Sequence, residues 1–403
     1  MRRFARLALL PIPLALAQPV YAGEWEAGGE VAAELRVFAE LPTYPGQLED
    51  FQSSGTFTGD LRWSSDDRKH QVVVVPFFRL DAEDSERTHG DLREGYYRYA
   101  GDEVDILIGA AKVFWGTTES RHLVDVINQT DAVEDIDEED KLGQPMVKIS
   151  LLKEWGKLDF FVLPYFRERT FPGRRGRLRF DPVIETDDPI FEDEDEEWNT
   201  DFAVRYSHYI GSVDFGLSAF SGTSREPGFN FDVDESGAAR LRPVYDQINQ
   251  LGVDFQYTQD AWLWKFEGIV REGQGNTFAA AVAGVEYTLF GITESGADLG
   301  LLAEYLYDGR DDDFTAPPTP LENDLFLGAR YALNDAQDTS ILAGTITDLD
   351  DGSSSGLIEA ERRLGANWTA ELEARFFFGV EDDNLLAAFR DDSVATFRIT
   401  RYF

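Results

Sequence analysis

The chain has 403 residues, no cysteine, and 76 acidic against 37 basic side chains, which gives a formal net charge of −39. The absence of cysteine excludes a disulfide framework and a cysteine-ligated zinc site. The strong acidity argues against nucleic acid as a partner, because phosphates require a basic surface. With 43% hydrophobic and 13% aromatic residues, the chain is also too apolar to be a disordered acidic protein.

The first residues have the layout of a secretory signal peptide. Arg2, Arg3 and Arg6 supply a positive start, residues 7–17 are apolar, and the small residue Ala22 precedes the expected cleavage point. An amphipathic or transmembrane helix is the alternative, but the interspersed prolines and the shortness of the apolar stretch argue against a span of ~20 residues. We expect removal of residues 1–22 and a single barrel domain over residues 23–403.

The body of the chain alternates apolar and polar residues with a period of two. In the segment 201–208, Phe202, Val204 and Tyr206 alternate with polar or small residues, and the same pattern recurs in the segments 213–219, 251–257, 262–267, 325–334 and 368–378. Such alternation gives a strand one apolar and one polar face. Since soluble antiparallel sheets alternate in the same way, this pattern alone does not decide the compartment.

Three further features favour a transmembrane barrel. The strand segments are about ten to twelve residues long, which suits a tilted membrane span. Aromatic residues gather beside the short turns, as an interfacial girdle requires, namely Trp155, Tyr209, Trp262, Trp264, Phe290 and Trp368. Eight short connections alternate with nine mostly longer loops. This pattern predicts an all-β fold, a transmembrane antiparallel up-and-down β-barrel of about 18 strands with long acidic extracellular loops.

The last residues carry a family resemblance. Ala395, Phe397 and Ile399 alternate with polar residues, and the segment finishes at Phe403. Such a strand resembles the assembly signal of Gram-negative outer-membrane β-barrels. The resemblance implies outer-membrane localisation, contact with outer-membrane lipid, and recognition by the barrel assembly machinery through Phe403.

A second resemblance lies in the middle of the chain. Gly109 is followed after five residues by Trp115-Gly116, then by Glu119-Ser120, and then by Asn128 and Asp131. This series is similar to a motif of porin-like outer-membrane barrels of poorly characterised function. The resemblance implies a barrel that passes small solutes and names no substrate.

The polar face of the strands is expected to line the lumen. Ten basic and ten acidic side chains fall on this face, so the wall is nearly balanced in charge. Its principal members are Arg205, Asp254, Lys265, Glu267, Glu286, Glu304, Arg330, Glu371, Glu373 and Arg375. These charges either hold a transverse field across an aqueous channel or pair with each other across neighbouring strands.

The negative excess must therefore lie in the loops. Residues 181–197 and 133–140 are densely acidic, and Asp308 and residues 311–313 add a further cluster. An acidic rim predicts a modest preference for cations. Binding of divalent cations to these carboxylates is the other interpretation.

The loop 117–144 differs from the others because it contains a compact apolar stretch of Leu123, Val124, Val126 and Ile127. We expect this stretch to dock on the inner wall. The polar side chains around it would then form a pore constriction, namely Arg121, His122, Asp125, Asn128, Gln129 and Asp131. The competing arrangement is an extracellular cap that never enters the barrel.

No enzyme motif is present. None of the four histidines lies in a recognised catalytic setting, and Ser120, His122 and Asp125 form the only closely spaced trio of triad residue types. No cofactor-binding or metal-binding motif is predicted. The sequence thus favours a non-enzymatic, porin-like channel for small hydrophilic solutes. The alternative is a non-conducting binding or structural barrel whose acidic loops hold cations or envelope partners.

Overall fold

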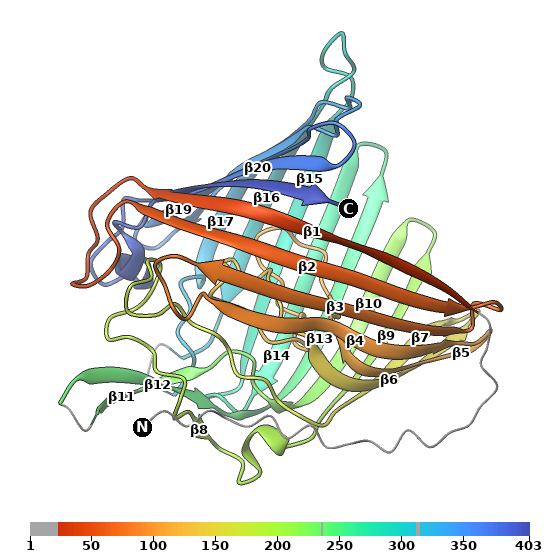
Figure 1. Ribbon diagram of the computed structural model, residues 1–403, viewed down its shortest axis with the longest axis horizontal. Coiled ribbons are helices and arrows are strands. Elements are labelled where there is room, and N and C mark those ends of the chain that lie inside the picture. Colours follow the sequence, from red (N-terminus) through yellow and green to blue (C-terminus); the bar gives the residue numbers. More distant parts are fainter. Residues whose placement is uncertain (1–22, 235–236, 312–314) are drawn as a thin grey trace.

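The computed structural model describes residues 23–234, 237–311 and 315–403, and its main feature is an 18-stranded antiparallel sheet. The first strand pairs both with the second strand and with the last, so the sheet closes into a barrel (Figure 1). The predicted 18-stranded up-and-down barrel is therefore confirmed. The predicted signal peptide, residues 1–22, lies outside the described residues.

The barrel strands follow the chain around the wall. They are β1 (Gly23–Phe38), β2 (Phe51–Ser65), β3 (His70–Asp81), β4 (His89–Ala100), β5 (Val104–Ala111), β6 (Gln144–Lys153), β7 (Gly156–Leu163), β9 (Asp201–Ile210), β10 (Val213–Thr223), β13 (Gln247–Gln259), β14 (Trp262–Glu272), β15 (Phe278–Leu289), β16 (Asp298–Asp308), β17 (Asn323–Ala332), β18 (Ser340–Asp348), β19 (Ser354–Arg363), β20 (Trp368–Phe378) and β21 (Val394–Tyr402).

Three short strands are not part of the barrel wall. β8 (Ile190–Phe191), β11 (Gly228–Val233) and β12 (Ala239–Tyr245) form a separate three-stranded sheet at the loop end of the barrel (Figure 1). Two 3-10 helices, η1 (Glu196–Trp198) and η2 (Leu385–Phe389), lie in the loops after β7 and β20. Among the described residues, no helix has the length and hydropathy that crossing a membrane requires.

The connections alternate in length as predicted. The eight short ones are residues 66–69, 101–103, 154–155, 211–212, 260–261, 290–297, 333–339 and 364–367, and all join strands at one end of the barrel. The nine connections at the other end include the loops 112–143, 164–200 and 379–393. Gly211 and Gly291 have φ angles of 64° and 60°, a conformation that lets the chain reverse tightly and that only glycine adopts at little cost.

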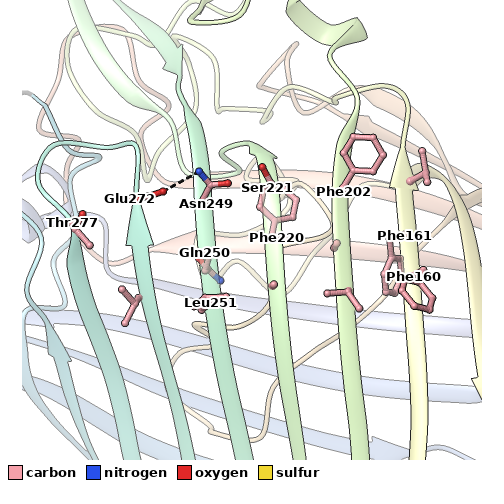
Figure 2. Close-up of a pocket in the computed structure, with 15 residues that line it drawn as sticks. Phe160, Phe161, Phe202, Phe220, Ser221, Asn249, Gln250, Leu251, Glu272 and Thr277 are labelled. Atoms are coloured by element: carbon pink, nitrogen blue, oxygen red, sulfur yellow. Dashed lines mark hydrogen bonds between the residues drawn. The ribbon is translucent and has the colours of Figure 1, made fainter.

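The outward face of the wall is apolar. On the strands shown in Figure 2, Phe160, Phe202 and Leu251 are 44%, 55% and 65% exposed, whereas their neighbours Phe161 and Gln250 are buried. Exposed apolar side chains of these strands line a shallow depression of about 660 Å³. All six aromatic residues predicted beside the short turns are exposed. A belt of this kind fits a hydrocarbon environment.

The inward face is less polar than predicted. Phe161, Ile248, Ile269, Leu306 and Phe326 point inward and belong to one buried apolar cluster. The expected polar face is therefore interrupted by apolar side chains in the half of the barrel near the long loops. The physical reason is that the loop 112–143 brings its own apolar side chains into this cluster, and they require apolar partners.

Candidate functional site: a loop inside the barrel

The loop 112–143, between β5 and β6, contacts opposite sides of the barrel. Its first half hydrogen-bonds to Glu267 of β14, and its second half to Arg79 of β3. Counted around the sheet, seven strands separate β3 from β14 one way and nine the other. Because Glu267 lies in the middle of β14, a loop that hydrogen-bonds to it enters the barrel and does not only cover its rim.

Two wall carboxylates hold the first half of the loop. Glu267 accepts hydrogen bonds from the backbone N–H groups of Thr117 and Thr118, at 2.6 and 3.1 Å, and from the Thr118 hydroxyl at 2.7 Å. Glu304 of β16 accepts from the backbone N–H groups of Glu119 and Ser120, at 2.9 and 2.8 Å, and from the Ser120 hydroxyl at 2.6 Å. Hydrogen bonds to ionised acceptors are the strong class, so these carboxylates fix the backbone of the loop.

The apolar stretch of the loop packs against the inner wall. Val124 and Ile127 are fully buried, and Leu123 and Val126 are nearly so, in the cluster that contains Phe161 and Ile269. Gly252 of β13 makes room for this contact, because an added Cβ would lie 3.1 Å from Val124 Cγ1.

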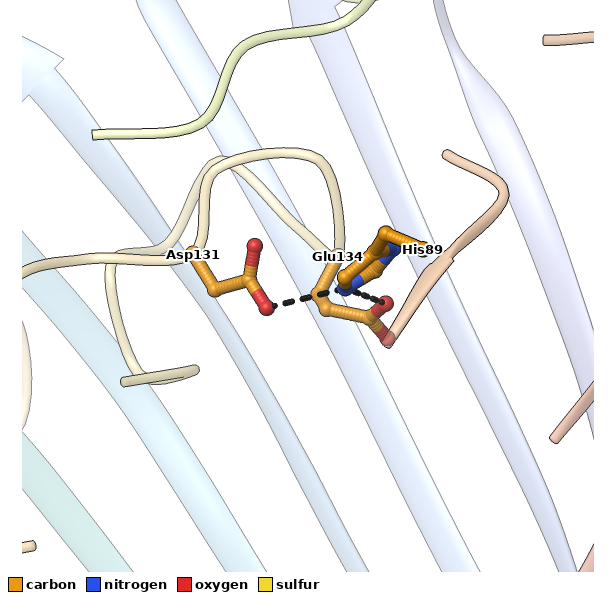
Figure 3. Close-up of side chains that lie close together, drawn as sticks. All are labelled: His89, Asp131 and Glu134. Atoms are coloured by element: carbon orange, nitrogen blue, oxygen red, sulfur yellow. Dashed lines mark hydrogen bonds and ion pairs between the residues drawn. The ribbon is translucent and has the colours of Figure 1, made fainter. Parts of the chain in front are cut away.

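The second half of the loop is held by positive side chains of β3 and β4. The Nε2 atom of His89 lies 3.2 Å from the Asp131 carboxylate and 3.4 Å from that of Glu134 (Figure 3). Arg93 Nη2 lies 2.6 Å from Asp131, and the Arg79 guanidinium forms a bidentate pair with Glu134. Burial alone raises the pKa of Asp131, but the hydrogen bond from His89 and the charge of Arg93 outweigh it and lower the pKa to about 2.

Two groups of side chains have the composition of a metal site. The ligand atoms of His89, Asp131 and Glu134 lie within 4.8 Å of one another, as do those of Asp135, Asp137 and Glu373. Arginines already contact both groups: Arg79 and Arg93 pair with the first, and Arg375 lies 2.6–3.0 Å from each carboxylate of the second. Both groups therefore hold the loop to the wall through ion pairs.

The predicted constriction residues divide into two sets. Arg121, His122 and Asp125 line a cavity of about 380 Å³ at the loop end of the lumen. Arg121 pairs with Asp308 at 3.0 Å and Asp125 with Lys141 at 3.4 Å. Burial lowers the pKa of His122, but the carboxylate of Glu267, 3.7 Å away, outweighs this effect and raises it.

The other three predicted constriction residues are not among the side chains that line this cavity. Asn128 is fully buried, and its amide nitrogen donates to the carbonyls of Ala111 and Leu142 at 2.9 and 2.8 Å. Gln129 and Asp131 are also fully buried. These side chains hold the loop in shape and against the wall.

The predicted wall residues lie on the inner face, and each one has a partner. Arg205 forms a bidentate pair with Asp254 across Gly216, where a side chain would collide with the Arg205 guanidinium. The remaining ion pairs are Lys265–Glu286 at 3.9 Å, Arg330–Glu119 at 2.7 Å, Glu371–Arg398 at 3.7 Å and Glu373–Arg375 at 2.8 Å. Glu267 and Glu304 serve as the loop anchors described above. Most of the predicted charged residues of the wall are therefore held in ion pairs.

A second cavity continues the first toward the short turns. It has a volume of about 250 Å³ and is lined by Arg330, Glu371 and Glu373 among others. Leu342 and Glu359 line both cavities. The two spaces therefore adjoin along the wall of β18 and β19, on the side of the lumen that faces Glu119, Arg121 and His122 of the loop.

Sequence reasoning missed two groups of residues in the lumen. Arg93 is buried at a β-bulge opposite Val75 and Pro76, and the bulge breaks the period of two on which the assignment of faces depends. Six phenylalanines line the larger cavity: Phe326, which belongs to the apolar cluster described above, and five others, namely Phe171, Phe180, Phe229, Phe377 and Phe389. They come from two loops, the hairpin β11–β12 and the wall, so no local pattern brings them together.

Comparison with known proteins gives similarity in structure alone. No protein-family model and no curated protein matches the sequence. A loop-deletion mutant of OmpT, an outer membrane protein of Vibrio cholerae, is 10% identical, with a TM-score of 0.49 over 95% of this chain and 100% of that chain. A mutant of the Rh. blastica porin is 11% identical, with a TM-score of 0.44 over 94% of this chain and 100% of that chain. The fold of the present protein is established by its own closed strand pairing.

Proposed function

We propose that this protein is a porin-like channel of the outer membrane through which small hydrophilic solutes diffuse, with a modest preference for cations. The observation that carries the proposal is that the two cavities of the lumen adjoin at Leu342 and Glu359, because this arrangement supports a route between the loop and the wall. The apolar outward face and the charged inner face support a membrane barrel with an aqueous interior.

The constriction of this channel lies between the loop and the strands β17 to β20. The loop contributes Glu119, Arg121, His122 and Asp125, and the wall contributes Glu359 and neighbouring charged residues. Charge and hydrogen-bonding groups at such a narrow point replace part of the hydration of a solute and select among solutes.

The arrangement of the triad residue types supports a channel and not an enzyme. The Ser120 hydroxyl donates to Glu304 at 2.6 Å, the Asp125 carboxylate lies near Lys141, and His122 faces Glu267. Among the described residues, no hydrogen bond joins Ser120 to His122. Ser120 therefore donates to a carboxylate that anchors the loop and not to an imidazole, so the three residues do not form a serine–histidine–aspartate triad.

We also propose that the long loops face the outside and the short turns the periplasm, and that β21 carries the signal for the assembly machinery. The backbone of Phe403 exchanges two hydrogen bonds with Gly29 of β1, at 3.0 and 3.1 Å, so the terminal residue closes the barrel seam. Binding of divalent cations to the acidic loops stays a prediction.

The experiment is the conductance of the purified protein in planar lipid bilayers, with reversal potentials measured in a KCl gradient. We expect discrete channels with a cation preference at low salt that fades near 1 M, where the Debye length is ~3 Å. Absence of channels from correctly folded protein would favour the non-conducting binding barrel. Clear anion selectivity at low salt would contradict the charge argument.

Deletion of residues 120–137 is a less direct test of the loop. It would remove Val124 and Ile127 from the inner apolar cluster and leave Ile248, Ile269 and Phe326 facing water. Exposure of so much apolar surface threatens assembly. Single substitutions at the wall anchors are therefore the better test of the constriction.

A further inference from the structure

Five of the six phenylalanines that line the larger cavity form a continuous row. The ring centroids of Phe171 and Phe229 are 5.8 Å apart, those of Phe229 and Phe180 6.0 Å, those of Phe180 and Phe389 5.2 Å, and those of Phe389 and Phe377 6.0 Å. None of the five is fully buried, so each presents part of its ring to the cavity. The row begins in the loop after β7 and ends at Phe377 on β20, two residues from Arg375.

A path for freely hydrated ions does not need such a row. Apolar rings offer nothing to a small hydrated ion, but they bind the apolar part of an organic solute. The ring faces also attract a cation through their quadrupole. The row therefore selects for a solute that carries an apolar group.

The charged residues around the cavity determine which sign of charge the solute should carry. Each arginine and lysine that lines it is already paired with a carboxylate, in the pairs Arg121–Asp308, Lys141–Asp125, Arg169–Glu138, Arg179–Asp181, Arg225–Asp201, Arg271–Glu226 and Arg375–Asp137. An anionic solute would have to displace one of these carboxylates.

Three carboxylates on the same cavity have no ion pair among the described residues, namely Glu139, Asp324 and Glu359. Asp324 is 2% exposed, and its Oδ2 atom has no hydrogen-bond partner. A buried carboxylate oxygen without a partner is costly, and a positive charge held nearby in the cavity would offset part of that cost. Glu139 belongs to the loop, and Glu359 belongs to the wall where the two cavities adjoin. Carboxylates without an ion pair therefore lie both on the loop and on the wall that faces it.

From the row of rings and the three unpaired carboxylates, we propose that the larger cavity is a binding site for organic ammonium ions that carry an aromatic or alkyl substituent. The substituent lies along the phenylalanine row and the ammonium group faces the carboxylates. This proposal rests on the proposed channel function in one respect: such ions would be the solute that passes through the channel. The binding site itself is tested separately from conductance.

The test is isothermal titration of the full mature chain in a non-ionic detergent with benzyltrimethylammonium chloride. The comparison ligands are tetramethylammonium, which lacks the ring, benzyl alcohol, which lacks the charge, benzoate, which reverses the charge, and maltose, which is a neutral sugar. We expect benzyltrimethylammonium to bind tightest, by about tenfold or more over each of the others. Equal or tighter binding of benzoate or maltose would overturn the proposal, as would the absence of binding by benzyltrimethylammonium.

Two substitutions locate the site. Phe180→Leu keeps an apolar side chain but removes a ring face, and Glu359→Gln removes an unpaired charge. Each is expected to weaken benzyltrimethylammonium binding about three- to tenfold. The matched controls are Phe290→Leu and Glu294→Gln, both in the short connection 290–297 at the opposite end of the barrel. If both cavity variants bind like the unmodified chain, the ligand lies elsewhere and the proposal is wrong.

Conductance measured on the same preparations separates the two proposals. Channels without benzyltrimethylammonium binding would refute the binding site and leave the channel standing. Binding without channels would refute the channel and leave the site standing. The ligand series is measured on the unmodified chain, so the proposal stays falsifiable even if a variant fails to assemble.

Discussion

Replacement of Glu304 by alanine should release the first half of the loop from the wall at the proposed constriction. Glu304 is 2% exposed and accepts three hydrogen bonds from Glu119 and Ser120. Hydrogen bonds to a charged group are worth about 1.5–3 kcal/mol each. Since the three share one acceptor and are not additive, we expect a total loss of about 3–5 kcal/mol in the docking of this segment.

The loss should be local. Glu267 still accepts hydrogen bonds from Thr117 and Thr118, and the ion pairs of Asp131 and Glu134 lie on the other side of the lumen. The barrel should therefore assemble, while the segment that carries Glu119 moves away from Arg330. We expect a larger single-channel conductance, a weaker ion selectivity, and new cleavage by protease within the loop.

The matched control is Glu286→Ala. Glu286 lies on the inner face of the neighbouring strand β15, and its one ion pair is with Lys265 at 3.9 Å. It is also acidic and faces the lumen, and among the described residues no hydrogen bond or ion pair joins it to the loop, so conductance and cleavage should change little. If Glu304→Ala leaves both measurements at the values of the unmodified protein, the loop is not the constriction and its anchoring has been misread.

Three further predictions concern pH, packing and topology. Burial and the charge of Asp135 raise the pKa of Asp137 to about 6, so this carboxyl becomes neutral as the pH falls through 6. The reversal potential should show a cation preference that declines between pH 7.5 and 5, and the decline should be smaller in Asp137→Asn, where Asp140, with a pKa also raised to about 6, still titrates. Gly252→Val places its Cβ 2.6 Å from Ser218 Oγ and 3.1 Å from Val124 Cγ1, so it should destabilise the protein by about 1–3 kcal/mol in urea unfolding, while Gly55→Ala, with its nearest atom at 3.6 Å, should not. An epitope inserted in residues 192–197 should be reached by antibody on intact cells, and one inserted at Gly211 only after permeabilisation; the opposite result would invert the barrel.

The sequence by itself determined the wall of the barrel. Side chains alternate between the two faces of a strand, so the period of two in the segments 201–208 and 368–378 fixed which residues point outward. The turns are local in sequence, and so the eight short connections and nine loops were all correctly located. The same alternation predicts that Arg205, Lys265, Glu304 and the other wall residues point inward.

Only the tertiary structure decided what those inward residues do. Glu267 and Glu304 look like any lumen charge in the sequence, but they hold a loop about 150–190 residues away along the chain. Asn128, Gln129 and Asp131 have the composition of pore-lining residues, and the structure instead uses them to fix the loop. The phenylalanine row joins Phe171 to Phe389 across four elements. Such contacts depend on barrel closure and on the path of long loops, and a one-dimensional pattern contains neither.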